Sequence, residues 1–150
     1  MHILERDITL NVGREKLWAF MSTPANLNEL TPADLQFQIV SSLPETMHEG
    51  LMIQYRIKIP MLGWQNWVTE ITHIREGEYF VDEQRLGPYR LWHHQHRLEA
   101  ISADQTRMVD RVSYLLPFWF AGELVHALWV EKMLDDIFSY RAKRLGEIFA

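Results

Sequence analysis

The segment RLWHHQHRLEAISADQTRMVDRVSYLL, residues 90–116, contains two runs of alternating residues separated by a short polar connection. Successive side chains of a β-strand point to opposite faces, so each run predicts a strand with one face toward the core. The connection, residues 102–105, has the length and polarity of a turn. The segment therefore predicts an antiparallel β-hairpin whose first strand carries three histidines.

The faces of the two runs predict how the strands pair. The more apolar face of the first run carries four residues: Trp92, His94, His96 and Leu98. The more apolar face of the second run carries five residues: Met108, Asp110, Val112, Tyr114 and Leu116. If these faces coincide, His96 lies opposite Asp110, with Cβ atoms about 4.5–5.5 Å apart. Trp92 then lies opposite Tyr114, whereas a register shifted by one residue brings Arg111 to His96 instead.

Five further runs predict strands, at residues 2–10, 35–40, 51–59, 64–74 and 78–86. The clearest is 51–59, in which leucine, isoleucine and tyrosine alternate with methionine, glutamine, arginine and lysine. The connections between these later strands are short. Because short connections join antiparallel neighbours, the runs from residue 35 onward predict an antiparallel meander.

Helical periodicity appears in three places. Residues 14–21 predict a short helix that stops near Pro24, and residues 26–35 predict a second short helical segment interrupted by Pro32. Residues 122–149 predict an amphipathic helix roughly 40 Å long. This order of elements predicts an α+β fold, in which a twisted antiparallel sheet of about seven strands curls around the long helix. A cavity is expected where the sheet and the helix do not touch.

Arg141 lies inside the apolar stripe of the predicted helix 122–149. The other members of the stripe are Ala127, Val130, Leu134, Ile137, Phe138, Leu145 and Ile148. In one interpretation the aliphatic stem of Arg141 packs while its guanidinium group reaches water. In the other, the charge is buried and pairs with an acidic residue beneath the helix.

The composition is that of a globular chain with a substantial core. Its 150 residues are 47% hydrophobic and 23% charged, which predicts one domain, 1–150. A net charge of -5 without any basic run argues against nucleic acid as a partner. Cysteine is absent, so disulfides and thiol catalysis are excluded. The sequence shows no signal peptide and no apolar stretch near the ~20 residues that span a bilayer. We therefore expect a cytoplasmic protein without stable membrane insertion.

A spaced pattern runs through the second half of the chain: Asp-x-Gln, Gly-Pro and Trp-x-His-x-His, followed by Asp-x-Val-x-Tyr. Its residues are Asp82, Gln84, Gly87, Pro88, Trp92, His94, His96, Asp110, Val112 and Tyr114. With the order of elements, which covers essentially the whole chain, this pattern resembles the START-like, or SRPBCC, superfamily. Within it, the pattern is similar to a bacterial subfamily labelled cyclase/dehydrase-like or cell-division-inhibitor-like. Leu98 departs from this likeness, because relatives more often carry phenylalanine there.

The resemblance implies a helix-grip fold, a seven-stranded antiparallel sheet wrapped around a long C-terminal helix, with two short helices after the first strand. Members of the superfamily bind lipids, sterols, quinones, hormones or polyketides in the interior, and only some are enzymes. The resemblance therefore implies a ligand-binding domain and leaves its chemistry open.

The histidine strand admits four interpretations. His94 and His96 with a carboxylate are acceptable zinc or iron ligands, but no third histidine is placed there, and we predict no metal and no cofactor. His96 oriented by Asp110 has the groups for proton transfer in a cyclisation or dehydration. His94, His96 and Tyr114 have the groups to hydrogen-bond an otherwise apolar guest, the interpretation we favour. In the fourth interpretation, the same groups only hydrogen-bond to one another, as a buried network that fixes the sheet against the helix and binds nothing.

Asp82 and Gln84 are harder to assign, because neither face of the run 78–86 is clearly apolar. The subfamily pattern suggests that both side chains point inward. Asp82 or Asp110 would then be a partner for Arg141. The alternative is that Asp82 and Gln84 are solvated residues on a surface strand.

Trp64 and Trp67 lie on opposite faces of their predicted strand, so at most one lines the cavity. Trp67 shares a face with Ile71 and is the better candidate. The sequence contains no Gly-rich phosphate loop, nucleophile elbow or dinucleotide fingerprint. These absences argue against phosphoryl transfer and nicotinamide chemistry.

The leading hypothesis is binding of a hydrophobic small molecule, such as a lipid, an isoprenoid quinone or a polyketide-like aromatic. The candidate binding residues are Trp67, Asp82, Gln84, Trp92, His94, His96, Asp110, Tyr114 and Arg141. One alternative is a cyclase or dehydratase in which His96 and Asp110 are the catalytic candidates. A second alternative is an interaction module whose apolar segment 115–125 docks a protein partner through three aromatic residues: Phe118, Trp119 and Phe120.

Overall fold

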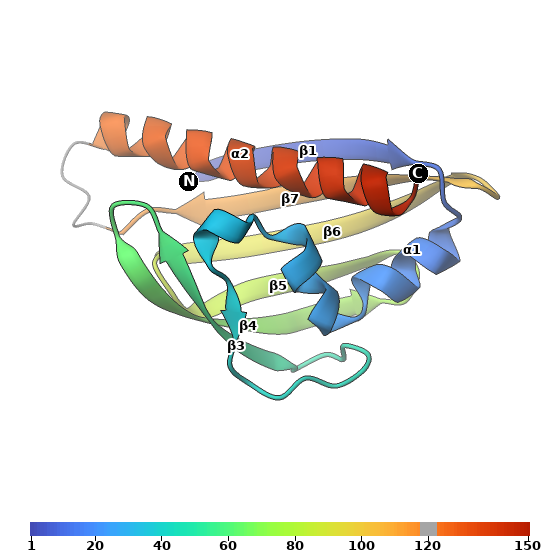
Figure 1. Cartoon of the computed structure of the whole chain (residues 1–150), viewed down its shortest axis with the longest axis horizontal. Helices are drawn as coiled ribbons and strands as arrows, with labels where there is room; N and C mark the ends of the chain where they lie inside the picture. Colours follow the sequence, from blue (N-terminus) through green and yellow to red (C-terminus); the bar gives the residue numbers. More distant parts are fainter. Residues whose placement is uncertain (118–122) are drawn as a thin grey trace.

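The computed structural model describes residues 1–117 and 123–150, and within these ranges seven strands form one antiparallel sheet (Figure 1). The strands are β1 (His2–Leu10), β2 (Gln38–Ile39), β3 (Met52–Ile59), β4 (Gly63–Arg75), β5 (Tyr79–Leu86), β6 (Leu91–Ser102) and β7 (Gln105–Leu115). Their order across the sheet is β1-β7-β6-β5-β4-β3-β2. The meander from β2 to β7 is therefore confirmed, and β1 adds to its far edge.

Four helices lie among the described residues: α1 (Arg14–Met21), η1 (Pro24–Leu30), η2 (Ala33–Leu35) and α2 (Glu123–Ile148). The long helix α2 contacts β1 and η1, and Figure 1 shows it running lengthwise over the curved sheet. This arrangement confirms the predicted α+β helix-grip fold. None of the helices in the described ranges is long and apolar enough to cross a membrane.

The register of the hairpin between β6 and β7 is the one in which the two apolar faces coincide. His96 pairs with Asp110, and Trp92 pairs with Tyr114. Leu98 and Met108, which also pair, are both buried in the core. A shifted register would turn these apolar side chains to the outer face, so their burial accounts for the observed pairing.

The predicted strand 35–40 is wrong in its extent. Only Gln38–Ile39 pairs with β3, because Leu35 still belongs to the 3₁₀ helix η2. Gln36 follows in the left-handed region, with φ 46°, and this breaks the extended conformation. The second predicted helical segment, 26–35, is correspondingly two short 3₁₀ helices rather than one.

The apolar stripe of α2 packs on the sheet, since Val130, Leu134, Phe138 and Leu145 are all buried. Burying each such side chain contributes roughly 1.5–3 kcal/mol, so these contacts hold α2 against the sheet. Arg141 lies within the stripe and is only 7% exposed. The segment proposed to dock a partner is 115–125, and its three aromatic residues, Phe118, Trp119 and Phe120, lie in 118–122, outside the described residues.

Candidate functional site

A cavity of about 190 Å³ lies between the sheet, η1 and α2. Alternate residues of β3 and β4 point into it, because successive side chains of a strand face opposite ways. Those of β3 are Ile53, Tyr55, Ile57 and Ile59, and those of β4 are Trp67, Thr69 and Ile71. A buried apolar cavity of roughly 150 Å³ admits benzene, so this cavity has room for a ring-sized apolar guest.

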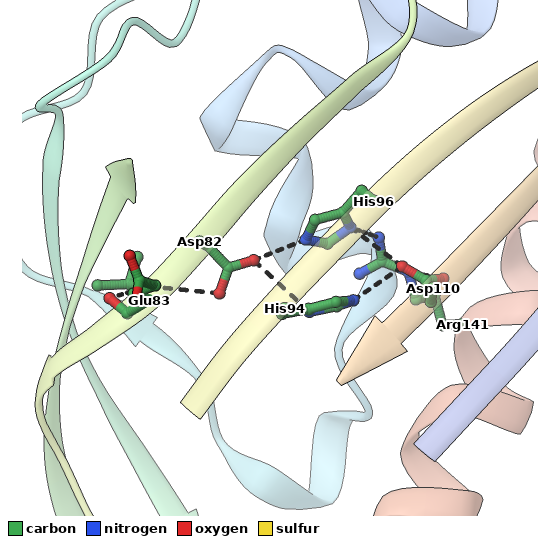
Figure 2. A network of polar contacts seen from close by, with 7 residues as sticks. Asp82, Glu83, His94, His96, Asp110 and Arg141 are labelled. Carbon is green, nitrogen blue, oxygen red and sulfur yellow. Dashed lines mark hydrogen bonds and ion pairs between the residues drawn. The ribbon is translucent and has the colours of Figure 1, made fainter. Parts of the chain in front are cut away.

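Charged and polar side chains gather at one wall of this cavity. We call Asp82, His94, His96, Asp110 and Arg141 the polar cluster. They come from β5, β6, β7 and α2, and four of them line the cavity while Asp110 lies behind the histidines. Figure 2 shows the two imidazole rings between the Asp82 carboxylate on one side and Asp110 with Arg141 on the other.

Each imidazole of the polar cluster lies between both carboxylates. His96 Nε2 is 2.6 Å from Asp82 Oδ2, and His96 Nδ1 is 3.0 Å from Asp110 Oδ1. His94 Nε2 is 2.9 Å from Asp110 Oδ1, and its Nδ1 is 3.5 Å from Asp82 Oδ2. The strand register produces this geometry, because Asp82 pairs with His94 and Asp110 pairs with His96.

Arg141 anchors the polar cluster to α2. Its Nε lies 3.5 Å from Asp110 Oδ2, which confirms that the guanidinium group pairs with a buried acid instead of reaching water. Its Nη2 lies 3.0 Å from His96 Nδ1, a nitrogen that also faces Asp110. His96 Nδ1 can therefore donate to the carboxylate when it carries the proton, or accept from Arg141 when it does not.

The close charges shift the pKa of four members of the polar cluster. Burial alone would raise the pKa of Asp110, but Arg141 and the two histidines hold it well below its usual value. Burial also opposes ionisation of Asp82, yet the histidines and Arg141 lower its pKa. Burial would lower the pKa of His96, but hydrogen bonds to both carboxylates, and their charges, raise it. Burial and the neighbouring His96 lower the pKa of His94. Both acids are therefore ionised at neutral pH, and His96 takes up a proton before His94.

Aromatic rings hold the two histidines in place. Phe80 stacks on His96 with ring centroids 4.0 Å apart, and the ring of His94 lies against that of His96 at 3.6 Å. Phe138 of α2 meets the edge of His94. These contacts leave the imidazoles little rotational freedom, so their nitrogens are fixed toward the carboxylates.

Two other candidate residues do not reach the cavity. Tyr114 is buried against His2 and Tyr89 and is absent from the cavity wall. Gln84 turns away, because its side-chain amide donates to the carbonyl of Tyr89 and its amide oxygen accepts from the Tyr89 backbone N–H. Trp67 and Trp92 do line the cavity, whereas Trp64 is 40% exposed on the outer face. His93 also lies on that outer face but is half-buried.

The hydrogen bonds of Gln84 give two residues of the spaced pattern, Gln84 and Gly87, a structural role in the turn between β5 and β6. A Cβ added to Gly87 would come within 2.4 Å of Gln84 Oε1. We expect Gly87→Ala to displace the Gln84 side chain from Tyr89 and to cost about 1–3 kcal/mol in urea unfolding. Gly146→Ala is the matched control, because nothing lies near that helical position and alanine there should stabilise by roughly 0.5–1 kcal/mol. Equal effects of the two substitutions would contradict the turn role.

Two tyrosines that were not among the candidates predicted from the sequence, Tyr55 and Tyr89, also line the cavity. Tyr55 stacks on Trp67, and Tyr89 packs against Trp67 and Trp92. Tyr55 had a sequence signal, since it lies on the apolar face of the clearest predicted strand. The indole Nε1 of Trp67 is buried and has no hydrogen-bond partner among residues 1–117 and 123–150, an unusual state for a buried donor.

The two buried tyrosines also make the stability of the fold depend on pH in the alkaline range. Burial, with the charge of Asp82, raises the pKa of Tyr55, and burial raises that of Tyr89. A group with a raised folded-state pKa contributes stability below its unfolded pKa, about 10 for tyrosine, and loses that contribution as pH rises further. We therefore expect thermal stability to fall above about pH 10, and to fall less in a Tyr55→Phe/Tyr89→Phe variant. An identical fall in both proteins would contradict this assignment.

Comparisons with known proteins agree on the fold. No protein-family model matches the sequence, and no curated protein matches it. Three of the solved structures that match share most of their length with this chain. TTHA0849 from Thermus thermophilus is 16% identical, with a TM-score of 0.69, over 97% of this chain and 95% of that one. The Zhui aromatase/cyclase from Streptomyces sp. R1128 is 11% identical, with a TM-score of 0.73, over 96% and 90%. A START superfamily protein from Mycobacterium smegmatis is 11% identical, with a TM-score of 0.64, over 99% of both chains. The chain therefore has the helix-grip fold of START-like proteins.

Proposed function

We propose that this protein binds a hydrophobic small molecule in the cavity between the sheet and α2. The observation that carries the proposal is a cavity of about 190 Å³ with a mostly apolar wall and one compact polar cluster. Ligand sites commonly have this composition, in which apolar surface supplies affinity and a few polar groups fix orientation. The START-like fold of the structural neighbours agrees with it.

The wall favours a flat guest that carries oxygen. Four aromatic rings form a continuous series of contacts on the cavity wall, in which Tyr55 stacks on Trp67, and Trp67, Tyr89 and Trp92 contact one another. Aromatic rings pack best against other flat π-systems. His94, His96 and Arg141 also line the cavity and carry N–H groups of the kind that bind a carbonyl or hydroxyl oxygen. An isoprenoid quinone or a polyketide-like aromatic meets both conditions better than a saturated acyl chain does.

Fluorescence titration tests this function. The probe is N-phenyl-1-naphthylamine, an uncharged aromatic amine that fluoresces strongly in an apolar environment. We expect saturable binding of one probe per chain, with quenching of tryptophan emission, and displacement by ubiquinone-type quinones before palmitate. Absence of saturable binding would contradict the function. Displacement by palmitate alone would contradict the preference for flat guests.

A second candidate function is a cyclase or dehydratase reaction on the guest. It is favoured by His94 and His96, which line the cavity and contact two ionised carboxylates. One structural neighbour is an aromatase/cyclase, which agrees with this candidate. Here His96 would transfer protons while Asp82 and Asp110 fix its orientation. Turnover of a poly-β-ketone substrate should fall roughly 10²–10⁴-fold in His96→Gln and stay unchanged in His93→Gln. Undiminished turnover in His96→Gln would rule out this role.

A further inference from the structure

Three side chains of the polar cluster bring metal-ligating atoms together at the cavity wall. One ligand atom each from Asp82, His94 and His96 lies within 4.8 Å of the other two. Asp82 Oδ2 is 2.6 Å from His96 Nε2 and 3.5 Å from His94 Nδ1. Ligands bound at 2.0–2.2 Å to a tetrahedral ion lie roughly 3.3–3.6 Å apart. The distance from Asp82 to His94 is already in this range, and the distance from Asp82 to His96 would lengthen when an ion replaces their hydrogen bond.

The opposite nitrogen of His94 is held in the way that metal-binding histidines require, because His94 Nε2 lies 2.9 Å from Asp110 Oδ1. His96 Nδ1 lies 3.0 Å from the same oxygen and also 3.0 Å from Arg141 Nη2, so it takes the same arrangement when it carries the proton. A carboxylate that accepts from the second nitrogen of a histidine fixes the tautomer and leaves the first nitrogen free for the metal. Arg141 in turn fixes Asp110 through their ion pair. Asp110 and Arg141 are thus placed to orient the two histidines that would bind the metal.

We propose that Asp82, His94 and His96 bind one divalent transition-metal ion of the Zn²⁺ or Fe²⁺ type. Two imidazole nitrogens and one carboxylate oxygen suit these ions, whereas Mg²⁺ and Ca²⁺ prefer oxygen ligands alone. All three residues line the cavity, so the remaining coordination positions face it. A carbonyl, phenolate or carboxylate oxygen of a guest would fill such a position. From the sequence we predicted no metal, because no third histidine is placed beside His94 and His96; in the structure Asp82 supplies the third ligand atom.

The charges of the polar cluster agree with an added cation. With both imidazoles neutral, two carboxylates and one guanidinium group leave one net negative charge in a buried site. A divalent ion changes this to one net positive charge, which a phenolate or carboxylate oxygen of a guest at an open coordination position would neutralise. An ion on His96 Nε2 would also occupy the nitrogen that proton transfer needs. Metal binding and general acid-base catalysis by His96 therefore exclude each other in the same molecule.

Metal analysis of the wild-type protein tests the proposal. The protein is stripped with a chelator, then incubated with Zn²⁺, or with Fe²⁺ under anaerobic conditions, and freed of excess ion by gel filtration. Inductively coupled plasma mass spectrometry should find one equivalent of the metal ion per chain. Co²⁺ should give visible absorption typical of a low-coordinate site with nitrogen ligands. Protein that retains neither Zn²⁺ nor Fe²⁺ would overturn the proposal.

Variants separate this site from adventitious binding at the surface. Asp82→Asn and His96→Gln should each lose the bound ion, and Asp110→Asn should weaken binding about 10–100-fold because it removes the carboxylate that orients the two histidines. His93→Gln, on the opposite face of β6, is the matched control and should keep a full equivalent. A full equivalent in both Asp82→Asn and His96→Gln would also overturn the proposal.

The metal proposal and the proposed binding of an apolar guest can be tested independently. Naphthylamine binding is measured on the chelator-treated protein, so failure of one result leaves the other intact. The wild-type Co²⁺ spectrum provides a readout that does not depend on whether any variant folds.

Discussion

Replacing Asp110 with alanine is expected to lower the free energy of unfolding by about 3–5 kcal/mol. Asp110 is buried and forms an ion pair with Arg141, and it accepts from His94. Without it, the guanidinium group of Arg141 stays buried in the core face of α2 with no carboxylate at that distance. Removing one partner of a buried pair leaves an uncompensated charge, which costs far more than a lost surface contact.

Urea unfolding of matched variants measures this effect. Asp7→Ala removes an acid from an exposed pair with Arg107, which lies on β7 as Asp110 does, and should cause no measurable change. Asp110→Leu/Arg141→Met removes both buried charges and should recover part of the stability lost in Asp110→Ala. A cost for Asp110→Ala no greater than that for Asp7→Ala would show that the polar cluster does not hold α2 to the sheet.

Replacing Ile137 with tryptophan is expected to weaken binding of the apolar probe at least tenfold, or about 1.4 kcal/mol. Ile137 lies on α2, is half-buried and lines the cavity. The larger indole would fill space that the guest needs. Because Ile137 is not fully packed, the helix should tolerate the change better than a replacement in the core.

The control for Ile137→Trp lies on the same helix. Leu128→Trp introduces the same side chain at a position that is 59% exposed and outside the cavity wall. Titration with N-phenyl-1-naphthylamine should give wild-type affinity for Leu128→Trp and weak binding for Ile137→Trp. Equal affinities in the two variants would place the probe somewhere other than this cavity.

The sequence was informative where long patterns repeat. The alternating residues of β6 and β7 are numerous enough that only one register buries both Leu98 and Met108. That register places His96 opposite Asp110, as predicted. Arg141 stood out because a charge within an apolar helical stripe needs a partner. That partner is Asp110, one of the two acids considered.

The sequence was less informative where tertiary contacts decide. Nothing in the chain marks Gln36 as left-handed, so the predicted strand 35–40 was too long. Asp82 and Gln84 share one face of β5 by pattern, yet only Asp82 reaches the histidines, because Gln84 bonds to the Tyr89 backbone across the turn. The third potential metal ligand was therefore visible as a residue but not as a neighbour of both histidines.

The most direct test of ligand binding is a native mass spectrum of the protein purified from its own organism without detergent. The bare chain has a mass of 17.9 kDa. We expect a second species, heavier by the mass of one apolar organic molecule, which disappears on denaturation and is absent from Ile137→Trp. A spectrum with the bare chain alone, together with no saturable binding of the naphthylamine probe, would contradict the function proposed here.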